Sequence, residues 1–403
     1  MKTFLVLLTI LVLACSVFAL DIDFFGKVEG RLRYETDNQT NNTDSDPNTA
    51  KDESKYNDLS FLYGGFMGTE AKFRNSLKAV AILALDSGSN LTKAPDKDDD
   101  SKSTPLTLDE AAVYYKTDQL FFAMGKYNEK DHVGKTLHYN PQKPIDSWWS
   151  DEHRPYMIGI SPGFFVSKNI MFKLSTDVIT NTHGSTTKTK GGSESENPSK
   201  DQWMISGSIP MTLMEKGALT FEPIFLYSLE GISEYEDTLG VSYNRNAPRL
   251  TFGAALSWKM TEMITFNLGG GMTSSNIDKE ADNDKSINAA FHKDSGMALH
   301  AGFSFKNIGF GTINLIGHYG TNKETKKSGN AEEDQTLNSM FFKVEYPIIL
   351  GRLDTENEKK REKTQIYLNP RLRVWMFTWD PDDAKELDKE TKIRPELIIG
   401  ARF

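Results

Sequence analysis

A strict two-residue alternation near both ends of the sequence constrains the fold more than any other feature. From Phe25 to Glu35, charged residues alternate with glycine, valine, leucine and tyrosine, so that an extended chain places all the charges on one face. The last ten residues repeat this pattern, with Arg394, Glu396, Gly400 and Arg402 on one face and Leu397, Ile399, Ala401 and Phe403 on the other. Such two-faced strands fit either a soluble β-sandwich or the wall of a membrane barrel.

The same rhythm continues along the whole chain. It predicts further strands near 58–73, 76–86, 108–117, 119–127, 153–167, 170–180, 202–213, 218–229, 248–259, 264–274, 295–305, 310–320, 337–349 and 364–379. With the two terminal strands the total is about sixteen, and an even number is what single-chain bacterial barrels require. Most of these strands are longer than the five or six residues that are usual in globular proteins.

The connections between these strands alternate between short and long. Short turns fall at 74–75, 117–118, 168–169, 214–217, 260–263 and 306–307, and long polar loops at 36–57, 87–107, 128–152, 181–201, 230–247, 275–294, 321–336 and 380–391. This alternation predicts an all-β, antiparallel, up-and-down transmembrane β-barrel with both termini on the short-turn, periplasmic side. The segment 350–363 is too long for a tight turn. It is either an extended turn or a sign that the strand count is off by two.

Bulk composition restricts the function without choosing the fold. The mean hydropathy of −0.49 and the 26% of charged residues suit a soluble protein, but a barrel with a polar lumen and polar loops gives similar values. No segment has eighteen or more continuous apolar residues, so no membrane-spanning helix is expected. The net charge of −9 argues against nucleic-acid binding, which favours a basic face.

The first residues indicate a secreted chain. A positive start at Met1-Lys2, an apolar run from Phe4 to Ala14 and a small residue at Ala19 are typical of a cleaved signal peptide over residues 1–19, which leaves 20–403 as one outer-membrane barrel domain. Cys15 then lies in the leader and the mature chain has no cysteine. In the alternative interpretation, Cys15 belongs to a loose lipoprotein box and carries a lipid.

Several short motifs resemble the general porin family of Gram-negative bacteria. Residues 25–34 resemble the family's opening strand, residues 66–80 its second hairpin, and residues 110–114 with 122–126 its fourth and fifth strands. The terminal Phe403 resembles the signal that the barrel-assembly machinery recognises. The resemblance covers about the first 130 residues and the last ten, and each motif is weak when taken alone.

The resemblance implies a homotrimer of sixteen-stranded barrels in outer-membrane lipid and lipopolysaccharide, with the third surface loop, 128–152, folded into the lumen. It also implies a pore constriction with a basic wall on the early strands and acidic residues on that loop. The matching basic positions are Lys27, Arg31, Arg33, Lys72, Arg74 and Lys126, all expected on the lumen side. The acidic positions are Glu129, Asp131, Asp146, Asp151 and Glu152.

The function expected from this pattern is passive diffusion of ions and small hydrophilic solutes, with no catalysis, cofactor or metal. Rings of charge would bias ion selectivity, although each charge could equally be an ordinary solvated one. The alternatives left open are a channel selective for a sugar or an anion, an adhesin, a barrel enzyme and a secreted soluble β-protein. No G-x-S-x-G motif is present, and neither the histidines nor Asp96, Asp98 and Asp100 have a convincing metal spacing.

Overall fold

The computed structural model describes most of the expected strands and few of the connections between them. It describes residues 21–41, 52–73, 76–86, 106–127, 157–180, 202–214, 218–229, 231–237, 240–246, 248–275, 289–328, 331–352, 364–381 and 388–403. The leader expected at 1–19 and the third loop, 128–152, lie outside these residues. The described part of the chain contains no helix that is long and apolar enough to cross a membrane.

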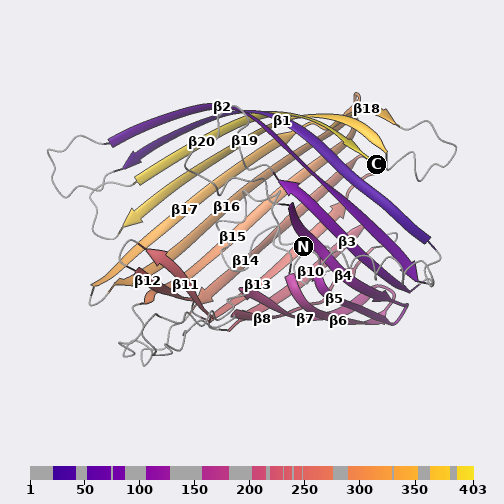
Figure 1. Cartoon of the computed structure of the whole chain (residues 1–403), viewed down its shortest axis with the longest axis horizontal. Coiled ribbons are helices and arrows are strands. Elements are labelled where there is room, and N and C mark those ends of the chain that lie inside the picture. The colour runs from indigo at the N-terminus through magenta and orange to yellow at the C-terminus, as the bar shows by residue number, and fades with distance from the viewer. Residues whose placement is uncertain are drawn as a thin grey trace, which may run out of the picture.

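Strands make up nearly all of the described chain (Figure 1). They are β1 (Asp21–Asn41), β2 (Asp52–Phe73), β3 (Leu77–Asp86), β4 (Leu106–Lys116), β5 (Leu120–Tyr127), β6 (Met157–Ser167), β7 (Ile170–Thr180), β8 (Gln202–Ser208), β9 (Met211–Thr212), β10 (Leu219–Ser228), β11 (Gly231–Asp237), β12 (Gly240–Asn246), β13 (Arg249–Lys259), β14 (Ile264–Ser275), β15 (Ala289–Ile308), β16 (Gly311–Ser328), β17 (Ala331–Glu345), β18 (Ile348–Arg352), β19 (Gln365–Pro381) and β20 (Asp388–Arg402).

The sheet is a closed antiparallel barrel of sixteen wall strands. Each wall strand pairs with its neighbour in sequence, and β1 pairs with both β2 and β20, which closes the ring. Segments β8 and β9 together form one wall strand, as do β17 and β18, and the hairpin β11–β12 lies outside the ring. The expected count of sixteen is therefore confirmed, and β18, which reaches Arg352, continues an existing wall strand.

Two prolines account for the interrupted wall strands. β8 and β9 are separated at Ile209-Pro210, and β17 and β18 at Tyr346-Pro347. Proline has no amide proton, so it cannot donate to the ladder of hydrogen bonds. The carbonyls of both prolines still accept bonds from the neighbouring strands, from Met171 at 3.1 Å and Thr312 at 3.2 Å. The sheet therefore continues across both breaks.

Several wall strands are longer than the sequence pattern predicts. β1 and β2 pair as far as Asn41 and Asp52, inside the expected loop 36–57, and β16 pairs with β17 as far as Ser328. The expected loop 230–247 contains the β11–β12 hairpin, and β12 runs parallel to the start of β15. These expected loops were wrong because hydrogen bonding continues where the apolar alternation has already stopped.

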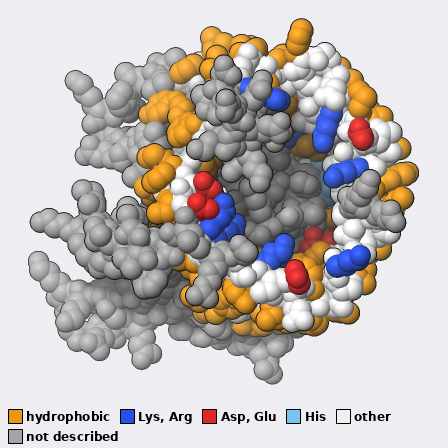
Figure 2. Space-filling view, turned by 90° about the vertical axis from the view of Figure 1, so that its right-hand side faces the viewer, with side chains coloured by type: hydrophobic (Ala, Val, Ile, Leu, Met, Phe, Trp, Pro, Cys, Tyr) orange, Lys and Arg blue, Asp and Glu red, His pale blue; other side chains and the backbone are white. Residues whose placement is uncertain are grey.

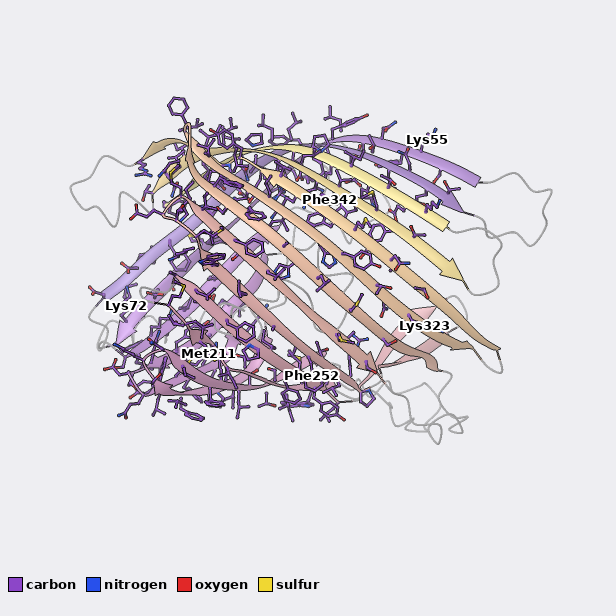
Figure 3. The ribbon with its side chains drawn as sticks, turned by 180° about the vertical axis from the view of Figure 1, so that it is seen from behind. Lys55, Lys72, Met211, Phe252, Lys323 and Phe342 are labelled. Carbon is purple, nitrogen blue, oxygen red and sulfur yellow. The ribbon has the colours of Figure 1, made fainter. Side chains whose placement is uncertain are left out.

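The two faces of the wall differ in chemistry. On β1 the exposed residues Phe24, Val28 and Leu32 alternate with the charged inner residues, and the same outward apolar pattern recurs on the other wall strands. Figure 2, seen from the right-hand end of Figure 1, shows orange side chains on the rim and blue and red ones inside the ring. Figure 3 shows outward side chains such as Phe252 and Phe342 on the back of the wall.

Both ends of the described chain lie at the same end of the barrel, on the right in Figure 1. The short connections described at 117–119, 168–169, 260–263 and 309–310 lie at this short-turn end. Phe403 exchanges two backbone hydrogen bonds with Gly26, of 2.8 and 3.1 Å, which completes the seam between β20 and β1.

Candidate functional site

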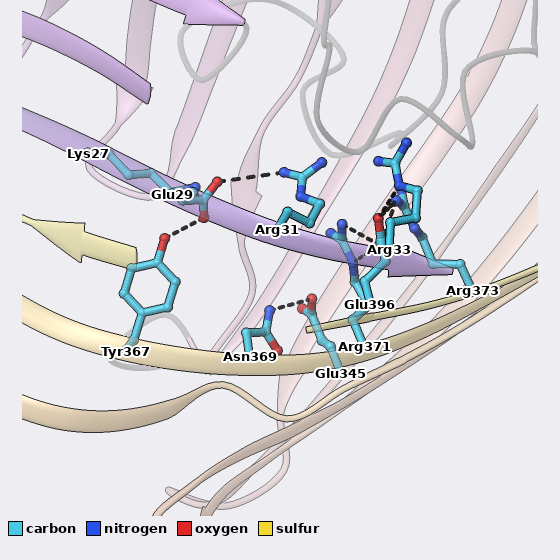
Figure 4. Close-up of polar contacts among 10 residues, drawn as sticks. All are labelled: Lys27, Glu29, Arg31, Arg33, Glu345, Tyr367, Asn369, Arg371, Arg373 and Glu396. Carbon is cyan, nitrogen blue, oxygen red and sulfur yellow. Dashed lines mark hydrogen bonds and ion pairs between the residues drawn. The ribbon is translucent and has the colours of Figure 1, made fainter. Parts of the chain in front are cut away.

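A group of charged side chains lines the middle of the inner wall on β1, β17, β19 and β20 (Figure 4). We call it the basic face. It comprises the cations Arg31, Arg33, Lys343, Arg371, Arg373 and Arg394 and the carboxylates Glu29, Glu35, Glu345 and Glu396. The two-residue period turns each of these side chains inward, while residues such as Leu32, Leu372 and Leu397 face outward from the same strands.

Glu396 is the centre of the basic face. The register places it between Arg33 on β1 and Arg371 on β19. Its carboxylate accepts hydrogen bonds from Arg33 Nε at 2.8 Å, Arg371 Nε at 2.8 Å and Arg373 Nη2 at 2.7 Å. The Glu396 side chain is 0% exposed, so three guanidinium groups surround one carboxylate that is removed from solvent. Charge-assisted bonds of this length are among the strongest polar contacts in proteins.

Glu29 links a second set of inner side chains. Lys27 Nζ lies 2.6 Å and Arg31 Nη2 3.6 Å from its carboxylate, and the Tyr367 hydroxyl donates a hydrogen bond to it from β19. Tyr367 reaches β1 across β20 because the intervening residue is Gly400. A Cβ at Gly400 would lie 2.5 Å from the Tyr367 hydroxyl oxygen.

Trp375 supports the basic face from β19. The guanidinium carbon of Arg373 lies 5.2 Å from its ring centroid and that of Arg394 lies 4.8 Å away. Arg394 also forms an ion pair with Glu35 across the seam to β1. An aromatic ring favours a cation over its face, so Trp375 holds two arginines close together despite their like charge.

Glu345 extends the basic face onto β17. Its carboxylate accepts hydrogen bonds from Asn314 Nδ2 at 3.1 Å and Asn369 Nδ2 at 3.4 Å. Lys343, two residues before Glu345 on the same face of β17, is buried and lies opposite Arg373 in the register. The basic face therefore spans five neighbouring strands when the asparagine on β16 is included.

Lys72, one of the predicted basic positions, lies away from this group. It is opposite Asp21 at the short-turn end of β1, and its ammonium contacts Asp23 at 2.9 Å and Glu70 at 3.2 Å. Lys78 also contacts Glu70, at 3.4 Å. We call these four residues, Asp23, Glu70, Lys72 and Lys78, the rim cluster. Of the predicted basic positions that the structure describes, Lys27, Arg31 and Arg33 lie together around Glu29 and Glu396.

Lys126 was expected on the lumen side, and this stays a prediction. It pairs with Ala111 on β4, and Gly125 before it has a φ of 113°, so the regular alternation of β5 does not extend to Lys126. Its ammonium donates to the backbone carbonyl of Leu108. The buried residues Phe121 and Ala123 mark the inward face of β5 in the stretch before Gly125.

The remaining predicted positions lie outside the described residues. They are Arg74 and the acidic loop residues Glu129, Asp131, Asp146, Asp151 and Glu152. Within the described chain, no group of three or more His, Cys, Asp or Glu side chains could hold a metal ion.

Several inner side chains on the early strands are apolar. Val80 and Ile82 on β3, Ala112 and Tyr114 on β4, and Phe121 on β5 are all buried and belong to one apolar cluster. Their register with Glu70 and Lys78 places them on the inner side. The lumen wall on β3, β4 and β5 therefore contains apolar side chains, and the buried Glu110, opposite Ile82, lies among them and accepts a hydrogen bond from the Tyr114 hydroxyl at 2.6 Å.

Sequence reasoning did not assign a role to Arg371, Arg373, Lys343 or Glu396. The signal was present, because Asn369, Arg371, Arg373 and Trp375 alternate with apolar residues as the charges of β1 do. The resemblance directed attention to the early strands, and strand neighbours at opposite ends of a sequence are not visible until the barrel closes. Arg33 and Glu396 are separated by 363 positions and lie side by side.

Comparisons with known proteins do not assign the chain to a family. No protein-family model matches it. A stretch of 113 residues is 27% identical to the SPbeta prophage-derived uncharacterized protein YorM of Bacillus subtilis (strain 168), which corresponds to 28% of this chain and 45% of that protein. The chain thus spans less than half the length of the curated relative that it matches.

Among solved structures the chain is similar to several outer-membrane proteins. In-vitro folded OmpT of Vibrio cholerae is 12% identical with a TM-score of 0.46, covering 96% of this chain and 99% of that one. The outer membrane channel DcaP of Acinetobacter baumannii is 10% identical with a TM-score of 0.46, covering 95% and 97%. An anion-selective porin from Comamonas acidovorans is 11% identical with a TM-score of 0.43, covering 95% and 99%.

Proposed function

We propose that this protein is an outer-membrane porin that lets ions and small hydrophilic solutes diffuse passively through its lumen. The observation that carries the proposal is the closed sixteen-stranded barrel with apolar side chains outside and charged side chains within. Closure pairs every wall strand on both sides, so no unpaired backbone edge would face lipid. A barrel of this strand number is wide enough for an aqueous channel.

Transport through such a barrel needs no chemistry from the protein. Charged groups fixed along the wall replace part of the hydration shell of a passing ion, and they bias which ions enter. The basic face supplies fixed charges near the middle of the wall, where a solute must pass. The outward apolar residues keep the barrel in the bilayer and supply no path for polar solutes.

The same proposal includes the route of assembly. We propose that residues 1–19 are removed as a signal peptide, that both termini face the periplasm and that Phe403 is the signal for the barrel-assembly machinery. The backbone pairing of Phe403 with Gly26 supports this, because the terminal residue then completes the closing seam. A homotrimer in lipid and lipopolysaccharide is part of the proposal through the porin resemblance alone.

Reconstitution of the purified mature chain into a planar bilayer tests the function. We expect stepwise increases in conductance as single barrels insert, and swelling of liposomes loaded with the protein when they are placed in a small neutral sugar. A chain that inserts as a heat-modifiable barrel and yet conducts no ions and passes no sugar would contradict the proposal. Boiled protein, added at the same concentration, is the control for leakage.

A further inference from the structure

We infer that the lumen passes small anions, inorganic ions and carboxylates alike, in preference to cations, and that the basic face sets this preference. The inference rests on the proposed function, since it requires an open channel. It concerns the residues on β17, β19 and β20 as well as those on β1, and so extends the region that sets selectivity from β1 to the closing side of the barrel.

The first argument is the balance of charge on the basic face. Its six cations outnumber its four carboxylates, so it carries two more positive than negative charges. The rim cluster differs, because its two lysines are matched by Glu70 and Asp23. The uncompensated positive charge of these two groups therefore lies near the middle of the wall and not at the short-turn opening.

The second argument is the difference in solvent exposure between the arginines and the central carboxylate. The Glu396 carboxylate is 0% exposed, and the side chains of Arg371 and Arg373 are 6% and 2% exposed. Arg33 and Arg31 are 18% and 17% exposed, so guanidinium groups reach the lumen while the central carboxylate does not. A cation that passes this surface cannot contact Glu396 and meets two partly exposed carboxylates, Glu29 and Glu35, whereas an anion meets three partly exposed guanidinium groups, those of Arg31, Arg33 and Arg394.

The third argument concerns the kind of anion. Three arginines of the basic face already bind a carboxylate, with nitrogen to oxygen distances from 2.6 to 2.8 Å. The planar guanidinium group has a geometry that matches two carboxylate oxygens, and it stays charged at any physiological pH. A small organic carboxylate such as acetate can therefore exchange between the partly exposed guanidinium groups as it passes.

Reversal potentials in a planar bilayer test the inference. With a KCl gradient we expect chloride to be more permeant than potassium, and with KCl opposed to potassium acetate we expect acetate to remain permeant. The Arg31→Glu variant and the Arg371→Gln/Arg373→Gln variant should each lower the ratio of chloride to potassium permeability. A unit charge about 10 Å away in a water-like dielectric corresponds to about a two-fold change in local ion concentration, before screening by salt.

The Lys72→Gln/Lys78→Gln variant is the matched control, because it removes two positive charges from the rim cluster and none from the basic face. Its permeability ratio should stay near that of the wild type. An equal loss of anion preference in this control would overturn the assignment to the basic face, and so would cation preference in the wild type. Arg31→Glu keeps the test decisive if the buried double variant fails to fold, because Arg31 is not a ligand of Glu396. If the wild-type protein shows no conductance at all, the proposed function itself is wrong.

Discussion

Glu396 shows how one buried side chain can hold several strands together. Its carboxylate binds arginines from β1 and β19 while it is itself carried by β20. Burying charges costs desolvation free energy, so the arrangement is stable only while each charge keeps its partner. The Glu396→Gln variant leaves three guanidinium groups close together with a neutral partner, and we expect it to lower the free energy of unfolding by about 3–5 kcal/mol.

The measurement is the temperature at which the folded band disappears from gels when samples are heated to increasing temperatures before electrophoresis, compared with the wild type. The matched control is Glu390→Gln, because Glu390 pairs with Lys392, which also contacts Asp37 at 3.1 Å. Lys392 therefore keeps a partner, and the control should unfold close to the wild-type temperature. Equal stability of both variants would show that the arginines do not depend on Glu396.

Gly400 is the second position where one residue decides the packing. The Tyr367 hydroxyl passes over it to reach Glu29, and a Cβ there would lie 2.5 Å from the hydroxyl oxygen. We expect Gly400→Ala to displace Tyr367 and to destabilise the barrel by about 1–3 kcal/mol, the usual cost of overpacking. Gly351→Ala is the control, since nothing lies within 4 Å of the Cβ that it would add. Thermal unfolding followed on gels compares the two, and equal midpoints would contradict the expectation.

Among the elements, the seam between β1 and β20 has a register that pairs of opposite charges constrain. Opposite charges meet at three successive inner positions of β1, where Arg33 contacts Glu396, Glu35 contacts Arg394 and Asp37 contacts Lys392. A slip by one residue would exchange the two faces, so the nearest competitor is a slip by two. One such slip places Glu35 opposite Glu396 and the other places Arg33 opposite Arg394, and like charges directly opposite destabilise a sheet.

This pattern predicts that closure depends on the signs of the seam charges. Glu35→Arg places two arginines together and should lower the yield of folded barrel on refolding into lipid vesicles. The exchanged pair Glu35→Arg/Arg394→Glu restores opposite charges at the same two positions and should recover much of that yield. The measurement is the fraction of heat-modifiable protein after a fixed time. If the exchanged pair does not recover the yield of folded barrel, the yield depends on which residue stands at each position and not on the pairing of opposite charges.

The elements also show what the sequence could predict. The alternation of apolar and charged residues located all sixteen wall strands, because the two faces of a membrane barrel meet different media. It could not find the ends of β1, β2 and β16, where both faces are polar and the alternation disappears. Nor could it find the contact between Arg33 and Glu396, because strand order around a closed ring brings the two ends of the chain together.

For the molecule as a whole, the outward apolar residues form a belt around the barrel, and polar outward residues lie beyond its edge. On β1 the outward apolar residues run from Ile22 to Tyr34, and the next outward residue of the described strand that is well exposed is Asn38. Lys55, opposite Asn38 on β2, projects outward beyond the same limit (Figure 3). The hydrocarbon core of an outer membrane would lie between these limits, and the polar extensions of β1 and β2 would stand in water.

An arginine substituted at one outward position inside the apolar belt, and at another outside it, tests whether the belt lies in the bilayer. Leu397 is exposed, lies opposite Leu32 and is near the middle of the outward apolar residues of the last strand, which run from Ile393 to Phe403. Leu397→Arg should reduce the stability of the barrel in phospholipid vesicles by about 2–4 kcal/mol, whereas Asn38→Arg, outside the belt, should change it by about 0–1 kcal/mol. Equilibrium unfolding by guanidinium chloride, followed by tryptophan fluorescence, measures both. In detergent micelles the difference in stability between the two variants should be smaller, because detergent molecules rearrange around a charged side chain. Equal effects of the two substitutions in vesicles would show that this wall does not span the bilayer.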